Sequence, residues 1–155
     1  MDIVVLAVGR LRPYYREAAD DYRRRLERYA SVREVSVREA GRAPTIDIQR
    51  RHEAEALSRK LPKRHTLVAL AREGDPWSST DLARRMARWR DDGATLVVAL
   101  GGSSGLAPDF IRSAALRWSL GPLTLPHELA RVVVYEQLYR AFTILGGERY
   151  HKGRE

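Results

Sequence analysis

The sequence predicts a single α/β domain, 1–155, in which helices flank a mostly parallel sheet. Apolar runs such as Ile3–Val8 and Thr95–Leu100 are typical of strands that are buried on both faces. Segments of helical period separate these runs, so strand and helix alternate along the whole chain. The 155 residues suffice for one core, and no linker-like segment divides them.

The first half of the chain is expected to hold three strands and two helices. After Ile3–Val8 these are a helix at 14–29, a strand at Val32–Val37, a helix at 46–60 and a strand at Thr66–Leu70. The first helix interleaves arginines with acids on its polar face, which favours a solvated surface over an RNA-binding stripe. The alternating pattern of Val32–Val37 predicts an exposed edge strand.

The second half begins with a polar loop, 71–77, after which Ser78 and Asp81 form a capping-box pattern that predicts a helix to about 90. We then expect the strand 95–100, a glycine-rich loop, a short helix near 108–115 and a strand at 116–120. The last helix, about 126–145, is apolar over most of its circumference, which predicts burial on more than one side. In so short a chain, a second subunit is expected to supply part of that burial.

The composition argues against several classes of site. Without cysteine the chain has no disulfide, thiolate nucleophile or cysteine-ligated zinc, and its four histidines show no close metal-ligand spacing. No apolar run approaches the roughly 20 residues of a membrane helix, and no signal peptide is evident, so a cytoplasmic location is expected. The net charge of +8 favours a polyanionic partner, although an arginine-rich genome would produce the same charge.

Three segments that follow strands are candidates for a ligand site: 71–77, 101–105 and 121–125. Open parallel sheets bind ligands beyond the carboxyl ends of their strands, and glycine lets backbone groups approach a ligand closely. The segment 101–105 lacks the Lys-Ser/Thr ending of a phosphate-binding loop. The three bends together predict a nucleotide-like ligand, whereas any one of them is also explained as a tight turn.

Two features near the C-terminus have a structural and a functional interpretation. Glu136 and Arg140 lie four residues apart on the last helix and are expected to neutralise each other, unless Arg140 contacts phosphate. The tail from Glu148 to Glu155 combines an aromatic ring, an imidazole and cations, which suits an RNA-facing element. A frayed chain end is the alternative.

Several motifs occur in order and at spacings that match a known family. They are Ala7-Val8-Gly9-Arg10-Leu11, Leu100-Gly101-Gly102-Ser103-Ser104-Gly105-Leu106, Leu123-Thr124-Leu125-Pro126-His127, Leu138-Tyr139-Arg140-Ala141-Phe142 and Tyr150-His151-Lys152. With them the chain resembles, over essentially its whole length, the ribosomal RNA large subunit methyltransferase H family of SPOUT-class enzymes.

The resemblance implies an α/β fold whose C-terminal segment forms a trefoil knot, a homodimer, and S-adenosylmethionine as cofactor. It also implies N3 of a pseudouridine in 23S ribosomal RNA, within the ribosome, as the methylated atom. The cofactor would be held mainly by backbone groups of three loops. The implied cofactor-binding residues are Leu70, Gly101, Leu120, Gly121, Pro122, Leu123, Thr124 and Leu125.

Three residues near the C-terminus are the catalytic candidates. The unperturbed pKa of histidine, roughly 6.5, suits His151 to remove the imide proton from a uracil-type N3. Tyr150 would stack on the target base, and Arg140, with Arg149, would hold phosphates.

The chain departs from the family pattern at Ala71, Asp75 and Ser104, where relatives commonly carry an acid, a lysine, and an asparagine or glutamate. The first two departures support an alternative function, that of a non-catalytic RNA-binding ribosome assembly factor with a degenerate cofactor pocket.

Overall fold

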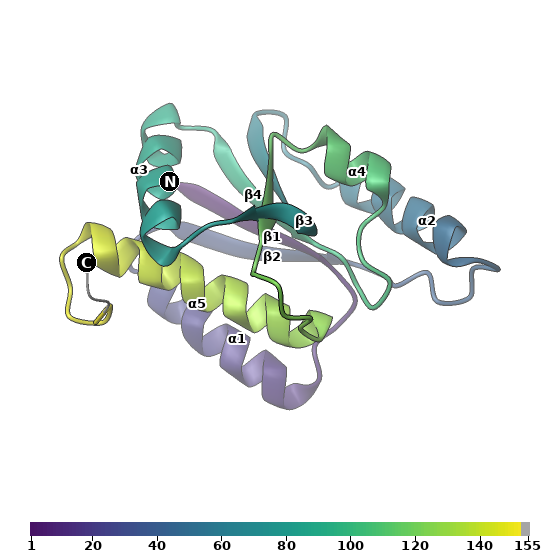
Figure 1. Cartoon of the computed structure of the whole chain (residues 1–155), viewed down its shortest axis with the longest axis horizontal. Coiled ribbons are helices and arrows are strands. Elements are labelled where there is room, and N and C mark those ends of the chain that lie inside the picture. The colour runs from purple at the N-terminus through teal and green to yellow at the C-terminus, as the bar shows by residue number, and fades with distance from the viewer. Residues whose placement is uncertain (153–155) are drawn as a thin grey trace.

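The computed structural model describes residues 1–152, in which five strands and five helices alternate (Figure 1). All the elements expected from the sequence are present, and the Ser78–Asp81 capping box is formed. In order they are β1 (Asp2–Val8), α1 (Pro13–Leu26), β2 (Ser31–Val37), α2 (Ile46–Ser58), β3 (His65–Pro76), α3 (Ser79–Asp92), β4 (Thr95–Leu100), α4 (Pro108–Ser113), β5 (Leu116–Ser119) and α5 (His127–Leu145).

The strands form one sheet in the order β2-β1-β4-β3-β5, and every strand pair is parallel. The predicted α/β class and parallel sheet are therefore confirmed, and β2 lies at an edge as its alternating pattern indicated. Because all strands run in one direction, all their carboxyl ends lie along the same side of the sheet.

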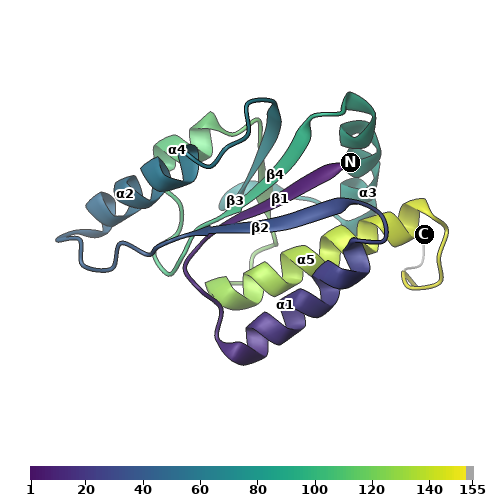
Figure 2. The same ribbon diagram turned by 180° about the vertical axis from the view of Figure 1, so that it is seen from behind.

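Helices cover both faces of the sheet. Helices α1, α3 and α5 pack on one face, and α2 and α4 pack on the other (Figures 1 and 2). In β1, Ile3 and Val5 belong to the first core, whereas Val4 and Leu6 belong to the second. This two-sided burial explains why the central strands are continuously apolar rather than alternating. No helix in the described range 1–152 is both long and apolar enough to cross a membrane.

The strand β3 extends beyond its predicted end at Leu70, so the expected loop at 71–77 is wrong in part. Leu70 and Asp75 both align with Trp118 of β5, and the register shifts between them. A Cβ on Gly74 would lie 2.7 Å from the carbonyl carbon of Arg117, so only glycine fits against the β5 backbone at this point. The sequence did not predict this extension for two reasons. Its side chains are mostly polar, and its strand conformation depends on pairing with β5, which is distant in the sequence.

The predicted burial of α5 on more than one side is confirmed, but helices of the same chain provide much of it. Its side chains Tyr135, Leu138 and Phe142 are buried between the sheet and the neighbouring helices α1 and α3. The ring of Phe142 stacks on Tyr29, with centroids 5.4 Å apart. The apolar circumference of α5 therefore does not by itself require a second subunit.

A buried ionic network joins α5 to α1 and β2. Arg131, only 1% exposed, donates to two backbone carbonyls at the carboxyl end of β1 and to Glu34 at 3.1 Å. Glu34 also accepts two hydrogen bonds from Arg16, at 2.8 and 2.9 Å, and one from the Tyr135 hydroxyl at 2.7 Å. Burial alone would raise the pKa of Glu34, but these hydrogen bonds and the nearby arginines outweigh it and lower the pKa to about 2.

We expect Glu34→Gln to lower the free energy of unfolding at neutral pH by about 3 kcal/mol, because Arg131 loses its buried counter-charge. The folded-state pKa of Glu34 lies below its unfolded value, so this stabilisation is complete above about pH 5 and is lost as the pH falls toward 2. The variant should consequently lose less stability than the parent over that range. Urea unfolding at pH 7 and pH 3 measures both effects.

The matched control is Glu27→Gln, at the exposed carboxyl end of α1, where Arg23 is 4.0 Å away. Its effect should stay below about 0.5 kcal/mol. A Glu34 variant as stable as this control would contradict the importance of the network.

Candidate functional site

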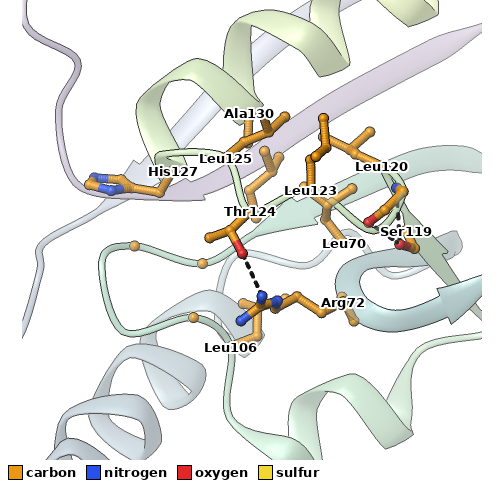
Figure 3. Close-up of a pocket in the computed structure, with 16 residues that line it drawn as sticks. Leu70, Arg72, Leu106, Ser119, Leu120, Leu123, Thr124, Leu125, His127 and Ala130 are labelled. Carbon is orange, nitrogen blue, oxygen red and sulfur yellow. Dashed lines mark hydrogen bonds between the residues drawn. The ribbon is translucent and has the colours of Figure 1, made fainter.

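A cavity opens beyond the ends of β4 and β5 and beside the part of β3 that continues past its pairing with β4 (Figure 3). Its empty volume is about 680 Å³, part of which is open to solvent. The lining residues are Leu70, Ala71, Arg72, Leu100, Gly101, Gly102, Gly105, Leu106, Ser119, Leu120, Gly121, Leu123, Thr124, Leu125, His127 and Ala130.

The structure brings together the three bends that the sequence singled out. Every residue expected to bind the cofactor lines the cavity except Pro122. Leu123 is 77% exposed at the mouth, although leucine is usually buried. Arg72 belongs to the predicted segment 71–77, and Leu106 and His127 belong to the family motifs, although none of the three was named individually as a contact. The sequence reasoning missed Ser119, at the end of β5, and Ala130, in the first turn of α5.

Glycine is required at several positions of the bends by the packing and conformation of the backbone itself. A Cβ on Gly101 would lie 2.4 Å from the carbonyl carbon of Gly105, so this glycine lets the loop fold back on itself. Gly105, with φ of +75°, closes that turn by donating to the carbonyl of Gly102 at 3.1 Å. Gly121 is different, because its φ is +111° and a Cβ there would meet only open space. Gly121 is thus required by backbone conformation rather than by crowding.

Helix α2 braces the glycine-rich loop from outside. Arg50 Nε donates to the carbonyl oxygen of Ser104 at 2.6 Å, and Ser104 Oγ donates to Gln49 at 3.3 Å. Gln49 in turn donates to Glu53 at 2.9 Å, a carboxylate that is only 2% exposed. Ser104, one of the departures from the family pattern, therefore helps to fix the loop from the side away from the cavity.

The remaining walls of the cavity are also held in place. The backbone N–H of Gly121 donates to Ser119 Oγ at 3.1 Å. Arg72 donates to the Thr124 hydroxyl and so joins the segment after Leu70 to the segment after β5 across the mouth (Figure 3). At the start of α5, Glu128 accepts hydrogen bonds from the backbone N–H and Nε of Arg12, at 2.6 and 2.8 Å, which lower its pKa.

The cavity is lined by leucines, glycine backbone and few polar side chains. Such walls suit an aromatic base and a short aliphatic chain, with hydrogen bonds supplied by exposed backbone groups. Among residues 1–152, no group of three or more His, Cys, Asp or Glu side chains could hold a metal ion.

The three catalytic candidates also lie together, around Glu136 on α5. Glu136 accepts from Arg140 Nε at 2.9 Å and from the Tyr150 hydroxyl at 3.0 Å. Arg140 lies over the Tyr150 ring, 4.8 Å from its centroid, and its Nη1 is 3.4 Å from Nδ1 of His151. The pairing of Glu136 with Arg140 expected from their spacing is therefore confirmed.

The tail is packed onto the protein as far as it is described. The ring of Tyr150 meets that of Tyr139 edge-on, with centroids 4.8 Å apart. Burial, together with the hydrogen bond to Glu136, raises the pKa of Tyr150, so its phenol stays protonated at neutral pH. The last part of the tail considered in the sequence, residues 153–155, lies outside the described residues.

The cavity lies beside the start of α5, whereas the tail that carries Tyr150 and His151 follows the other end of this helix (Figure 1). His127 lines the cavity, and Arg140 follows 13 residues later in the same helix. At 1.5 Å per residue the two positions are about 20 Å apart along the helix axis. Reacting atoms must approach to about 3 Å, so the cluster of one chain does not reach the cavity of that chain in this conformation.

Comparison with known proteins identifies the family to which the chain belongs. A family model described as "Predicted SPOUT methyltransferase" matches residues 1–151. A protein of Pseudomonas aeruginosa named ribosomal RNA large subunit methyltransferase H is 41% identical, with 98% of this chain and 100% of the relative covered. A protein of the same name from Pseudomonas putida is 40% identical over the same shares of the two chains.

Solved structures of lower sequence identity share the fold. One is a probable methyltransferase from Bordetella pertussis, with a TM-score of 0.56, 18% identity, and 90% of this chain and 95% of that chain covered. Another is a probable methylase family protein from Haemophilus influenzae, with a TM-score of 0.57, 11% identity, and coverage of 99% and 71%. The chain therefore belongs to the SPOUT methyltransferases, enzymes with an α/β-knot fold that use S-adenosylmethionine.

Proposed function

We propose that this chain methylates N3 of a pseudouridine in 23S ribosomal RNA within the large ribosomal subunit. In this proposal residues 1–155 form one methyltransferase domain, and two copies form a homodimer. The full-length similarity to relatives named ribosomal RNA large subunit methyltransferase H supports the substrate class. The observation that carries the proposal is the open cavity beyond the ends of β4 and β5 and beside β3.

The residues of this cavity fit S-adenosylmethionine. Its apolar walls and its glycine backbone suit a nucleoside that carries an amino-acid side chain. Leu100, Leu106 and Leu125 would enclose an adenine ring, and the backbone groups of the three bends would bind its polar edge. The bound cofactor supplies a methyl group whose carbon is already electrophilic, because it is bonded to a positively charged sulfur. The protein has only to exclude water and hold the target nitrogen in line with that group.

The C-terminal cluster would act on the RNA. His151 takes up the imide proton at Nδ1, the nitrogen that faces Arg140 in the single chain. Arg140 brings a positive charge close to the anion left at N3 and to neighbouring phosphates. Tyr150 places its ring beside both side chains, and its hydroxyl remains bound to Glu136. Positioning and a general base together are worth several orders of magnitude in rate.

The separation of these two sites supports the homodimer. About 20 Å of α5 lies between the cavity and Arg140, so the cluster that serves one cavity would come from the partner copy. An isologous dimer places the same two surfaces against each other twice and so completes two sites at once.

The alternative of a binding protein with a degenerate pocket finds little support in the cavity. The departures Ala71 and Asp75 do not close it, since Ala71 merely forms part of the wall and Asp75 pairs with β5. The space remains open rather than filled by side chains.

We expect Gly121→Val to weaken the binding of S-adenosylmethionine at least about tenfold, because a β-branched residue does not tolerate the φ of +111° at this position. Isothermal titration calorimetry measures the affinity, and thermal unfolding shows whether the fold persists. Gly41→Val is the control, since Gly41 is exposed, has no positive φ and has free space around it. Equal affinities in the two variants would place the cofactor elsewhere.

The origin of the C-terminal cluster can be tested by mixing subunits. A chain ending at Arg149 should bind the cofactor but not methylate RNA. The Gly121→Val chain should leave its own cavity largely empty when the cofactor is kept below the dissociation constant of that variant. Dimers formed randomly from equal amounts of the two should recover about a quarter of the parent activity, because half are mixed and each mixed dimer has one intact site. Absence of recovery would contradict an active site shared between subunits.

His151→Ala should lower kcat for methyl transfer by about 10²–10⁴-fold and leave the affinity for the cofactor unchanged, because a general base acts only on the chemical step. Single-turnover assays with ribosomal substrate measure the step directly. Parent-like turnover in this variant would remove His151 from the role of base.

A further inference from the structure

We propose that Arg72 determines how the cavity discriminates between the methyl donor and its demethylated product, and that it favours the product. This inference rests on the proposed location of the cofactor. It makes Arg72 a specificity-determining residue, which neither the sequence motifs nor the comparison with relatives singled out.

The first observation is the charge of the cavity wall. Among the 16 lining residues, Arg72 is the only one with a permanent charge, and none is acidic. The other ionisable lining residue is His127. Glu39 and Glu128 lie near the cavity but outside its lining, and both have partners, since Glu39 accepts from Ser103 and Glu128 from Arg12. Glu73, which follows Arg72 in β3, also lies outside the lining. The charge of Arg72 is therefore not offset by an acid within the wall.

The second observation is the position of that charge. The Arg72 side chain is exposed, but its guanidinium is held by the Thr124 hydroxyl across the mouth of the cavity (Figure 3). Both residues line the same space. This position places a positive charge beside the space that a ligand would fill.

The two forms of the cofactor differ only at the sulfur. Methyl transfer breaks the bond between methyl carbon and sulfur, the electron pair of that bond stays on sulfur, and the carbon bonds to the target nitrogen. S-adenosylmethionine thus loses a methyl group and one positive charge and becomes S-adenosylhomocysteine. The adenosine, carboxylate and ammonium groups are unchanged, so their contacts cancel in the ratio of the two affinities.

The charge of Arg72 is expected to change the ratio of the affinities for the donor and the product. It repels the positively charged sulfur of the donor and has no such effect on the neutral sulfur of the product. Because Arg72 is exposed, solvent weakens the repulsion, and we expect a contribution of about threefold to tenfold to the affinity ratio.

The test is isothermal titration calorimetry of the full-length protein with S-adenosylmethionine and with S-adenosylhomocysteine, at low salt and at one fixed pH. The parent should bind the product more tightly than the donor. In Arg72→Gln the ratio of the two dissociation constants should shift about threefold to tenfold toward the donor. Arg72→Lys retains the charge and should keep the parent ratio.

The matched control is Arg33→Gln, which removes the same charge from an exposed position on the far edge strand β2 and should also keep the parent ratio. At about 1 M salt, where the screening length is roughly 3 Å, the parent ratio should approach that of Arg72→Gln.

Three results would overturn the inference. An unchanged ratio in Arg72→Gln would show that the charge does not act on the sulfur. A shift in Arg72→Lys equal to that in Arg72→Gln would show that hydrogen-bond geometry, rather than charge, sets the ratio. Failure of the parent to bind either compound would reject the proposed cofactor pocket, and the inference about Arg72 with it. This result is distinguishable from the first two, in which both compounds bind.

Discussion

The parallel direction of all five strands is the constraint on which the rest of the molecule depends. It brings every carboxyl end to one side of the sheet, so bends that lie far apart in the sequence become neighbours there. The segments after Leu70, Leu100 and Ser119 meet in this way and form the walls of one cavity. The backbone of β5 lies so close to β3 that Gly74 must lack a side chain.

The same constraint sets the two ends of the molecule apart. Helix α5 starts beside the cavity and runs back toward the amino ends of the strands, where Glu136 and Arg140 gather Tyr150 and His151. A rigid helix packed between α1 and α3 keeps this distance fixed. In the proposed homodimer, the second copy would bring its C-terminal cluster to the cavity of the first.

Charge is used differently in the core and at the cavity. Glu34 unites Arg16, Arg131 and Tyr135 in a network whose members are paired, and this ties α1, β2 and α5 together. At the mouth of the cavity, Arg72 bonds to a neutral hydroxyl and meets no lining acid. The first arrangement serves stability, because an unpaired buried charge is costly, whereas the second leaves a charge free to act on a ligand.

Sequence alone determined the order of the elements, the parallel sheet, the edge position of β2 and most of the cavity lining, because these follow from local periodicity and from glycines after strands. The family motifs added the knot and the cofactor. Only the tertiary structure decided that β3 continues past Leu70, that Gly101 makes room for Gly105, and that Arg72 reaches Thr124. Each of these is a contact between segments distant in the chain or a turn folded on itself. Local pattern carries no information about such contacts, since they depend on how packed elements meet.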